Sequence, residues 1–124
     1  MAGKLVHFEI TAEDAQRAKS FWSSLFGWRF QEWSGPIEYH MLEPGDGPGG
    51  AIYPAEKRDG HVIVYFDVDD MDAALEKVAE LGGSVIEGKS PIPEIGYFAR
   101  CRDTEGTAFS LFQPDDTVPM PTSQ

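Results

Sequence analysis

The sequence predicts an α+β fold made of two βαβββ modules in tandem. Two stretches, residues 11–27 and 69–83, each combine an acidic residue near the start, apolar residues at helical spacing and a glycine at the end. A strand-like run precedes each stretch, and three more follow it. A four-stranded module of this size cannot bury both faces of its sheet alone, so the two modules must pack together. We therefore expect a curved mixed sheet around a shared cleft, with the helices on the outer face.

The first module is expected to span residues 4–54. Its opening strand, "LVHFEI", alternates between two faces; one carries Val6, Phe8 and Ile10, and the other carries Leu5, His7 and Glu9. Thr11 is the expected N-cap of the helix, and Gly27 its C-terminal stop. The segments that predict the remaining strands are "WRFQEW", "IEYHML" and, after a glycine-rich turn, "AIY".

The second module is expected to span residues 61–113, after the polar linker "PAEKRDG". The strand "HVIVYFDV" leads to Asp69 or Asp70 as helix cap, and Gly82 and Gly83 end the helix. Three further strands are predicted by "SVIEG", "GYFARCR" and "AFSLFQ". Together the modules form a single domain over residues 1–113, and the Pro- and Asp-containing segment 114–124 is expected to be a flexible tail.

Composition excludes several classes of protein. The formal net charge of −11 argues against nucleic acid and anionic membrane as partners, because phosphates would be repelled. The sequence has no apolar run long enough to cross a bilayer and no basic-then-apolar signal segment at its start. The single cysteine, Cys101, cannot form an intrachain disulfide, which fits a reduced, cytoplasmic setting. Alternation points Cys101 away from its arginine neighbours and predicts a packed thiol.

The chain resembles the vicinal oxygen chelate superfamily, which includes glyoxalase I, bleomycin resistance proteins and extradiol dioxygenases. The segments that carry the resemblance are "HFEITAEDAQRAKSFWSSLFGW", "VDDMDAALEKVAELGG" and "SPIPEIGYFARCRDTEGTAFSLFQ". The last resembles the closing section of the family's glyoxalase-like branch, with Thr104 and Thr107 where that branch usually has Pro and Asn. The resemblance implies the paired βαβββ fold but no single chemistry.

Metal-using members of this superfamily place one ligand, usually His or Glu, on each of four strands. The resemblance puts these positions at His7, Ala51, Ile63 and Ser110. Only His7 is a strong ligand, since Ala and Ile bind no metal and a serine hydroxyl is a poor ligand for Zn²⁺, Ni²⁺ or Fe²⁺. His61 shares a face with Ile63 but lies about 6.6 Å along the strand, so only a β-bulge would bring it to a metal. We expect no cofactor, with a divalent metal as the alternative.

The expected cleft combines aromatic and polar side chains, as a small-molecule site requires. His7 and Glu9 are the candidate acid–base residues, because a carboxylate enclosed in a cavity can take a proton from a substrate. A solvated carboxylate is the alternative for Glu9, packing between modules is the alternative for the aromatic residues, and His40 is expected to be structural or exposed. The candidate ligand-binding residues are Ile63, Tyr65, Asp67, Ser110, Phe112 and Tyr53.

Three functions remain open at this point. The first is a metal-independent glyoxalase- or bleomycin-resistance-like protein that binds a small organic molecule and, if an enzyme, acts as a lyase or isomerase. The second is a metal-dependent lyase, isomerase or dioxygenase. The third is an antibiotic-sequestering protein, suggested by the acidity and by Trp22, Trp28 and Trp33. The resemblance also implies a homodimer, with modules paired within a chain or exchanged between chains.

Overall fold

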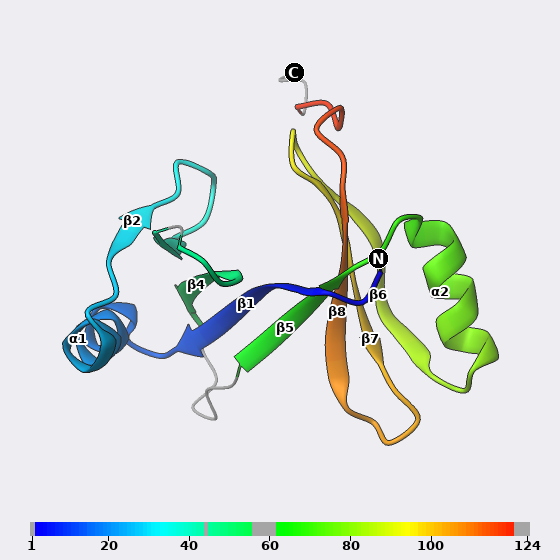
Figure 1. Cartoon of the computed structure of the whole chain (residues 1–124), viewed down its shortest axis with the longest axis horizontal. Coiled ribbons are helices and arrows are strands. Elements are labelled where there is room, and N and C mark those ends of the chain that lie inside the picture. Colours follow the sequence, from blue (N-terminus) through cyan, green and yellow to red (C-terminus); the bar gives the residue numbers. More distant parts are fainter. Residues whose placement is uncertain (1, 44, 56–61, 121–124) are drawn as a thin grey trace. The chain divides into compact units, whose positions relative to one another are not determined.

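The computed structural model describes residues 2–43, 45–55 and 62–120 (Figure 1). The chain divides into two compact units, one of residues 6–64 and the other of residues 65–124 together with residues 1–5. Along the chain, the order of one strand, one helix and three strands occurs twice, so the predicted α+β class is confirmed and the element order agrees with the predicted duplication. The cleft that the two modules were predicted to share stays a prediction.

The first module places its strands in the order β2-β3-β4-β1. β1 and β4 run parallel, while β3 is antiparallel to both β2 and β4. β2 and β3 are shorter than the sequence predicted. The elements are β1 (Leu5–Ala12), α1 (Ala15–Phe26), β2 (Phe30–Glu32), β3 (His40–Leu42) and β4 (Gly49–Pro54).

The prediction that Thr11 caps the first helix is wrong. β1 continues two residues further than expected, so Thr11 is paired with Tyr53 of β4 and cannot reach the helix. Asp14 caps α1 instead, and its carboxylate accepts a hydrogen bond of 3.0 Å from the amide of Arg17. The equivalent residue of the second module, Asp70, accepts in the same way from Ala73 at 3.2 Å. The duplication therefore extends to the chemistry of the helix caps.

Phe8, on the apolar face of β1, packs toward α1. A Cβ at Gly50 would lie 2.5 Å from the far end of the Phe8 ring, so the ring packs directly over this glycine of the neighbouring strand. Trp28 contacts Phe8 at 6.1 Å between centroids and stacks on Trp22 of α1 at 5.3 Å. Yet the most buried side chains of β1 are Glu9 and Thr11, on the face predicted to be polar.

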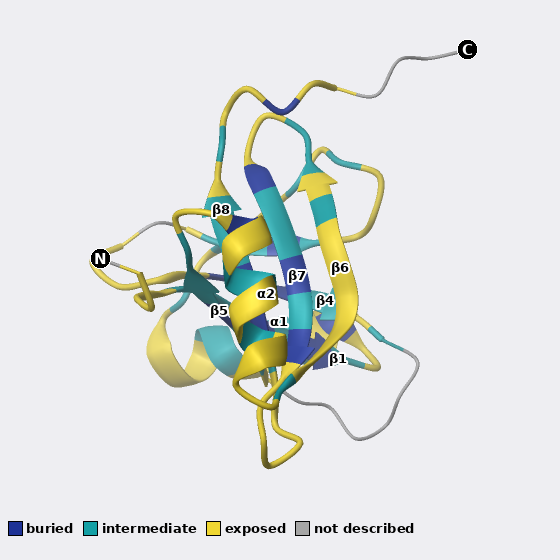
Figure 2. Ribbon diagram, turned by 90° about the vertical axis from the view of Figure 1, so that its right-hand side faces the viewer, coloured by how far each residue is buried: buried dark blue, intermediate teal, exposed yellow. Residues whose placement is uncertain are grey.

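The second module places its strands in the order β5-β8-β7-β6. α2 packs against this sheet, and the buried core between them contains Met71, Ala99, Cys101 and Leu111. β7 is mostly buried or half-buried, whereas β6, at the edge of the sheet, is mostly exposed (Figure 2). The elements are β5 (Val62–Asp67), α2 (Met71–Glu80), β6 (Ser84–Ile92), β7 (Gly96–Arg102) and β8 (Ala108–Pro114).

Cys101 is packed as predicted. It is fully buried in the core beside α2, and burial raises the pKa of its thiol. A raised pKa keeps the sulfur protonated and therefore a weak nucleophile.

Both ends of the chain make backbone contacts with the second unit. Gly3 donates to the carbonyl of Asp67, and the Lys4 amide donates to the Asp67 carboxylate at 2.8 Å. At the other end, the expected tail of residues 114–124 begins inside β8. Val118 is buried, and its carbonyl accepts from Glu94 at 2.8 Å. Along the described parts of the chain, no helix has the length and hydrophobicity to span a membrane.

Candidate functional site

β1 and β4 build one face of the candidate site in the first module. Their parallel register sets His7 beside Gly49 and Glu9 beside Ala51. Because both neighbours are small, the imidazole and the carboxylate have room on this face. A Cβ at Gly49 would lie 3.3 Å from Nδ1 of His7, so even a methyl group there would crowd the ring.

Tyr39 joins the two predicted acid–base residues. Its hydroxyl donates to Oε2 of Glu9 at 2.6 Å and lies 2.8 Å from Nε2 of His7. A phenol carries one proton, and here that proton points to Glu9, so Nε2 of His7 must be the donor in the second contact. A neutral His7 then carries its proton on Nε2 and its lone pair on Nδ1. The three side chains form a continuous hydrogen-bonded chain.

Burial sets the protonation state of His7 in this hydrogen-bonded chain. Glu9 is only 7% exposed, and its carboxylate accepts the hydrogen bond from Tyr39. Desolvation lowers the pKa of His7, and the negative charge of Glu9 opposes this in part. The imidazole is therefore neutral at neutral pH and can donate through one nitrogen while accepting through the other.

Two aromatic rings lie beside the ring of Tyr39. The Tyr39 ring lies 6.0 Å from that of Tyr53 and 5.8 Å from that of Trp33. The amide of Trp33 also donates to the Tyr39 carbonyl at 2.9 Å, which ties the residues before β3 to those after β2. Tyr53, predicted to contact ligand, thus lies against Tyr39 on the same side of the module.

Sequence reasoning missed Tyr39. The segment "IEYHML" was expected to form a strand, and its alternation places Tyr39 on the face opposite His40. That pattern could have flagged a phenol, but it could not show that this phenol meets His7 and Glu9.

The other predicted site residues lie on β5 and β8. Tyr65 is paired in register with Ser110, and Asp67 with Phe112; Tyr65 and Ser110 are both buried. Asp67 has a structural contact, since it accepts from the Lys4 amide. Ile63 is half-buried in β5. The structure thus brings together His7, Glu9 and Tyr53 in the first unit, and Tyr65, Ser110, Asp67 and Phe112 in the second.

A family model described as the Glyoxalase/Bleomycin resistance protein/Dioxygenase superfamily matches residues 4–111. The chain belongs to this superfamily. The match covers nearly all of both modules, in agreement with the duplicated caps and the repeated strand order.

The chain is similar to three curated proteins. The putative glyoxylase CFP32 of Mycobacterium bovis and of Mycobacterium tuberculosis is 34% identical over 116 residues, which are 90% of this chain and 44% of that protein. The chain therefore spans less than half the length of these relatives. A glyoxylase-like domain-containing protein of Didymella fabae is 31% identical over 119 residues, covering 88% of this chain and 92% of that protein.

Solved structures share the fold of this chain. Methylmalonyl-CoA epimerase from Mycobacterium tuberculosis aligns with a TM-score of 0.70 at 18% identity, over 91% of this chain and 88% of that one. A hypothetical protein from Bacillus halodurans C-125 aligns with a TM-score of 0.73 at 13% identity, over 98% and 99% of the two chains. At these identities the likeness concerns the fold alone.

The metal centre known from superfamily members does not fit the residues present here. The register pairs Glu9 with Ala51 and Tyr65 with Ser110, which supports the predicted equivalence of the Ala51 and Ser110 positions. Of the four expected positions, Ala51 and Ile63 carry no donor atom and Ser110 a weak one. No group of three His, Cys, Asp or Glu side chains among the described residues could hold a metal ion. His61, the alternative second ligand, lies outside those residues.

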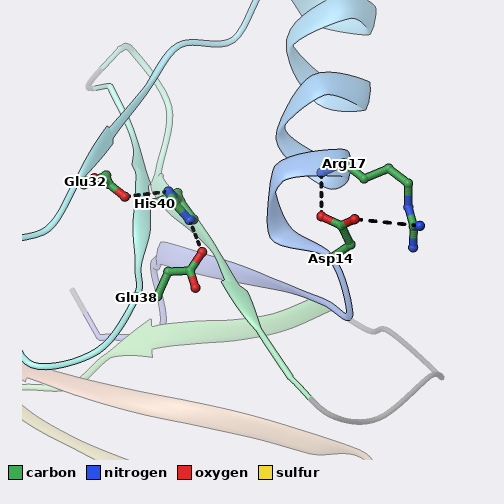
Figure 3. Close-up of polar contacts among 5 residues, drawn as sticks. All are labelled: Asp14, Arg17, Glu32, Glu38 and His40. Carbon is green, nitrogen blue, oxygen red and sulfur yellow. Dashed lines mark hydrogen bonds and ion pairs between the residues drawn. The ribbon is translucent and has the colours of Figure 1, made fainter.

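His40 lies on the face of the sheet opposite this site, because it is paired with Ile52, which alternates with Ala51 along β4. Figure 3 shows His40 with its neighbours Glu32 and Glu38. His40 is fully buried, its Nε2 lies 2.7 Å from Oε2 of Glu38, and its Nδ1 lies 3.7 Å from Oε1 of Glu32. Within the described parts of the chain, Nδ1 has no hydrogen-bond partner. The sequence predicted His40 to be either structural or exposed. Because His40 is buried, the structural alternative holds. This histidine anchors β3 directly beside Tyr39.

His7 makes a pH-dependent contribution to stability. Its folded pKa is lowered from 6.5, so between the lowered value and 6.5 the unfolded chain binds more protons than the folded one. Protonation of His7 therefore favours the unfolded chain, and the contribution of the neutral imidazole to the free energy of unfolding is lost as pH falls below 6.5. His7→Gln removes the titration. Between about pH 7.5 and about pH 5.5, we expect urea midpoints to fall more for the unchanged protein than for His7→Gln. Equal falls would contradict the assignment.

Proposed function

We propose that the protein binds a small carbonyl compound beside His7, Glu9 and Tyr39 and moves a proton at the carbon next to the carbonyl. This is the chemistry of a lyase or isomerase. The observation that carries the proposal is the Tyr39 hydroxyl, 2.6 Å from the Glu9 carboxylate and 2.8 Å from His7 Nε2.

Glu9 is the proposed base. Its carboxylate is buried, so water has little access to it and competes little with it as a proton acceptor. The Tyr39 hydroxyl holds the carboxylate in one orientation. His7 in turn orients the phenol through its Nε2 proton. As Glu9 accepts a proton and loses its negative charge, its hydrogen bond with Tyr39 weakens, and that hydroxyl becomes available to the substrate oxygen on which charge develops.

The names of the relatives agree with this class of reaction. One relative is called a putative glyoxylase, and one structural neighbour is a methylmalonyl-CoA epimerase. A proton transfer next to a carbonyl group is compatible with both names, and it is also compatible with the acid–base chain of His7, Tyr39 and Glu9.

Nuclear magnetic resonance in D₂O tests the proposal. Candidate compounds, among them 2-oxo acids, hemithioacetals and acyl thioesters, are incubated with the full chain, and loss of the C–H signal beside the carbonyl is followed. Exchange above the uncatalysed rate in at least one class is the expected result. Exchange that persists unchanged in a variant lacking both Glu9 and Tyr39 side-chain functions would overturn the proposal.

We further propose that this proton transfer does not depend on a metal. The protein purified without a histidine tag or chelator is expected to contain far less than one Zn, Ni or Fe per chain by elemental analysis. A tight metal site needs three or four convergent ligands, whereas the four ligand positions of the superfamily hold a single strong ligand here, His7. About one metal per chain, lost in His7→Ala, would contradict this prediction and favour the metal-dependent reading.

The antibiotic-sequestering function has less support. Trp22 and Trp28 stack on each other beside Phe8, on the face of the first module that packs toward α1. Trp33 contacts Tyr39, with 5.8 Å between the ring centroids.

We also propose a homodimer in a reduced, cytoplasmic setting. The superfamily assignment and the single buried thiol support this assembly and location. Light scattering at micromolar concentration is expected to give twice the chain mass, and a stable monomer would refute the dimer.

A further inference from the structure

Residues 33–39 connect β2 to β3, and the connection begins and ends with an aromatic residue. The amide of Trp33 donates to the carbonyl of Tyr39 at 2.9 Å, so the connection is closed at its base by a backbone hydrogen bond. The rings of these two residues lie 5.8 Å apart between centroids, with their planes inclined by 68°, which is an edge-to-face arrangement. The connection therefore holds Trp33 against the residue that joins His7 to Glu9.

Gly35, in the same connection, supports the Trp33 ring. A Cβ at Gly35 would lie 2.2–2.3 Å from three atoms of the six-membered ring of the indole, so this ring lies directly over the Gly35 backbone. Gly35 and Tyr39 together fix the orientation of the indole. A ring that is already held in one orientation loses little conformational entropy when a ligand packs against it.

Tyr39 connects this aromatic region to the proposed base. Its ring lies 5.8 Å from that of Trp33 and 6.0 Å from that of Tyr53, while its hydroxyl donates to Glu9 at 2.6 Å. A ligand that lies along Tyr39 with its reacting C–H at Glu9 would therefore place the rest of its structure beside these rings. The three aromatic residues are half-buried and Glu9 is buried, so the rings keep accessible surface next to an enclosed carboxylate.

The tryptophans of the first module lie on two different faces. Trp22 and Trp28 pack with Phe8 on the face toward α1, where they contribute to the packing of the helix. Trp33 packs on Tyr39 instead, on the face that carries the proposed base. Aromatic surface beside a small number of polar groups is typical of a small-molecule site.

We propose that Trp33 is a specificity-determining residue of this site and selects carbonyl compounds that bear an aromatic ring. An aromatic group can pack edge-to-face or offset on the indole, and such pairs are favourable beyond the area that they bury. A saturated ring of the same size gains only from the burial of its apolar surface. This inference rests on the proposed function and narrows its substrate class from small carbonyl compounds to aryl carbonyl compounds.

Acetophenone and cyclohexyl methyl ketone are the probes for the test. Both are uncharged methyl ketones with the same number of carbon atoms, and they differ in whether the ring is aromatic. Each is titrated into the ¹⁵N-labelled full chain, and the indole N–H signals are followed, with that of Trp33 assigned by its loss in Trp33→Leu. We expect acetophenone to shift the Trp33 signal with saturation and to leave the signals of Trp22 and Trp28 in place. We also expect acetophenone to bind at least about fivefold more tightly than cyclohexyl methyl ketone, or by about 1 kcal/mol.

Tetramethylammonium chloride is a third titration, because aromatic rings also bind cations and the chain has a formal net charge of −11. Weaker binding of this cation than of acetophenone is the expected result. Tighter binding of the cation would overturn the aryl substrate class.

Two tryptophans on opposite faces of the module provide a matched pair of variants. Trp33→Leu is expected to bring the affinities for the two ketones within about twofold of each other, because leucine offers burial without an aromatic face. Trp22→Leu is the same substitution on the face toward α1 and is expected to keep the preference for acetophenone. Urea unfolding checks that both variants fold.

Gly35→Ala is a second way to disturb the Trp33 ring. It keeps all three tryptophans, and the added methyl group would occupy the space of the indole. Gly35 does not have a positive φ, so its backbone accepts alanine. We expect this variant to lose most of the preference for acetophenone, and its result decides the question if Trp33→Leu does not fold.

The outcomes separate this inference from the proposed function. Equal affinity of the unchanged protein for the two ketones, or a preference that persists in Trp33→Leu, would overturn the aryl specificity, even if C–H exchange at Glu9 is found. A preference lost equally in Trp22→Leu would overturn it as well. A preference that depends on Trp33 alone would support the inference even in the absence of exchange, and only the proposed proton transfer would then fall.

Discussion

Glu9→Gln is expected to lower the rate of substrate C–H exchange by about 10²–10⁴-fold, the range that a positioned general base contributes. Glutamine keeps the size of the side chain and can still accept a hydrogen bond from Tyr39, so the change removes the base and preserves the packing. The exchange rate in D₂O is the measurement. Glu13→Gln, at an exposed carboxylate just beyond β1, is the matched control and is expected to retain the full rate.

Tyr39→Phe separates the base from the group that orients it. Removing the hydroxyl breaks the contacts with both His7 and Glu9 and leaves the ring in contact with Tyr53 and Trp33. We expect the exchange rate to fall by about tenfold or more, because the Glu9 carboxylate loses the hydrogen bond that holds it in one orientation. An unchanged rate would show that the phenol takes no part in the chemistry.

Gly96→Ala is expected to destabilise the protein by about 3 kcal/mol or more. Gly96 lies where β7 begins, and a Cβ there would be 2.1 Å from the carbonyl oxygen of Gln113 on β8. A backbone atom of a paired strand cannot move aside as the end of a side chain can. The β7–β8 pairing would have to shift, and with it the register that aligns Arg100 with Ser110.

Gly88→Ala is the control for the Gly96 prediction. Gly88 lies on β6, the neighbouring strand, and an added Cβ would meet no atom within 4 Å. Urea unfolding of the two variants should show a large fall in midpoint for Gly96→Ala and a small change for Gly88→Ala. Similar midpoints for both would mean that the sheet adapts at Gly96.

Local patterns in the sequence were sufficient to predict both helices and most strands. Asp70 and Gly27 mark helix ends through chemistry that involves only a few neighbouring residues, so they can be read without tertiary information. The Thr11 prediction was wrong for the converse reason. Whether Thr11 caps a helix or extends β1 depends on its pairing with Tyr53, which is remote in sequence.

The sequence by itself determined that His7 and Glu9 share a face, because strand alternation is a property of adjacent residues. It also determined the duplication that relates Glu9 to Tyr65 and Ala51 to Ser110. Only the tertiary structure decided that Tyr39 joins His7 to Glu9, since that contact needs β3 paired with β4 and β4 paired with β1. The pairing of strands that are distant in sequence depends on many weak contacts acting together. The sum of these contacts sets the position of the Tyr39 hydroxyl between its two partners.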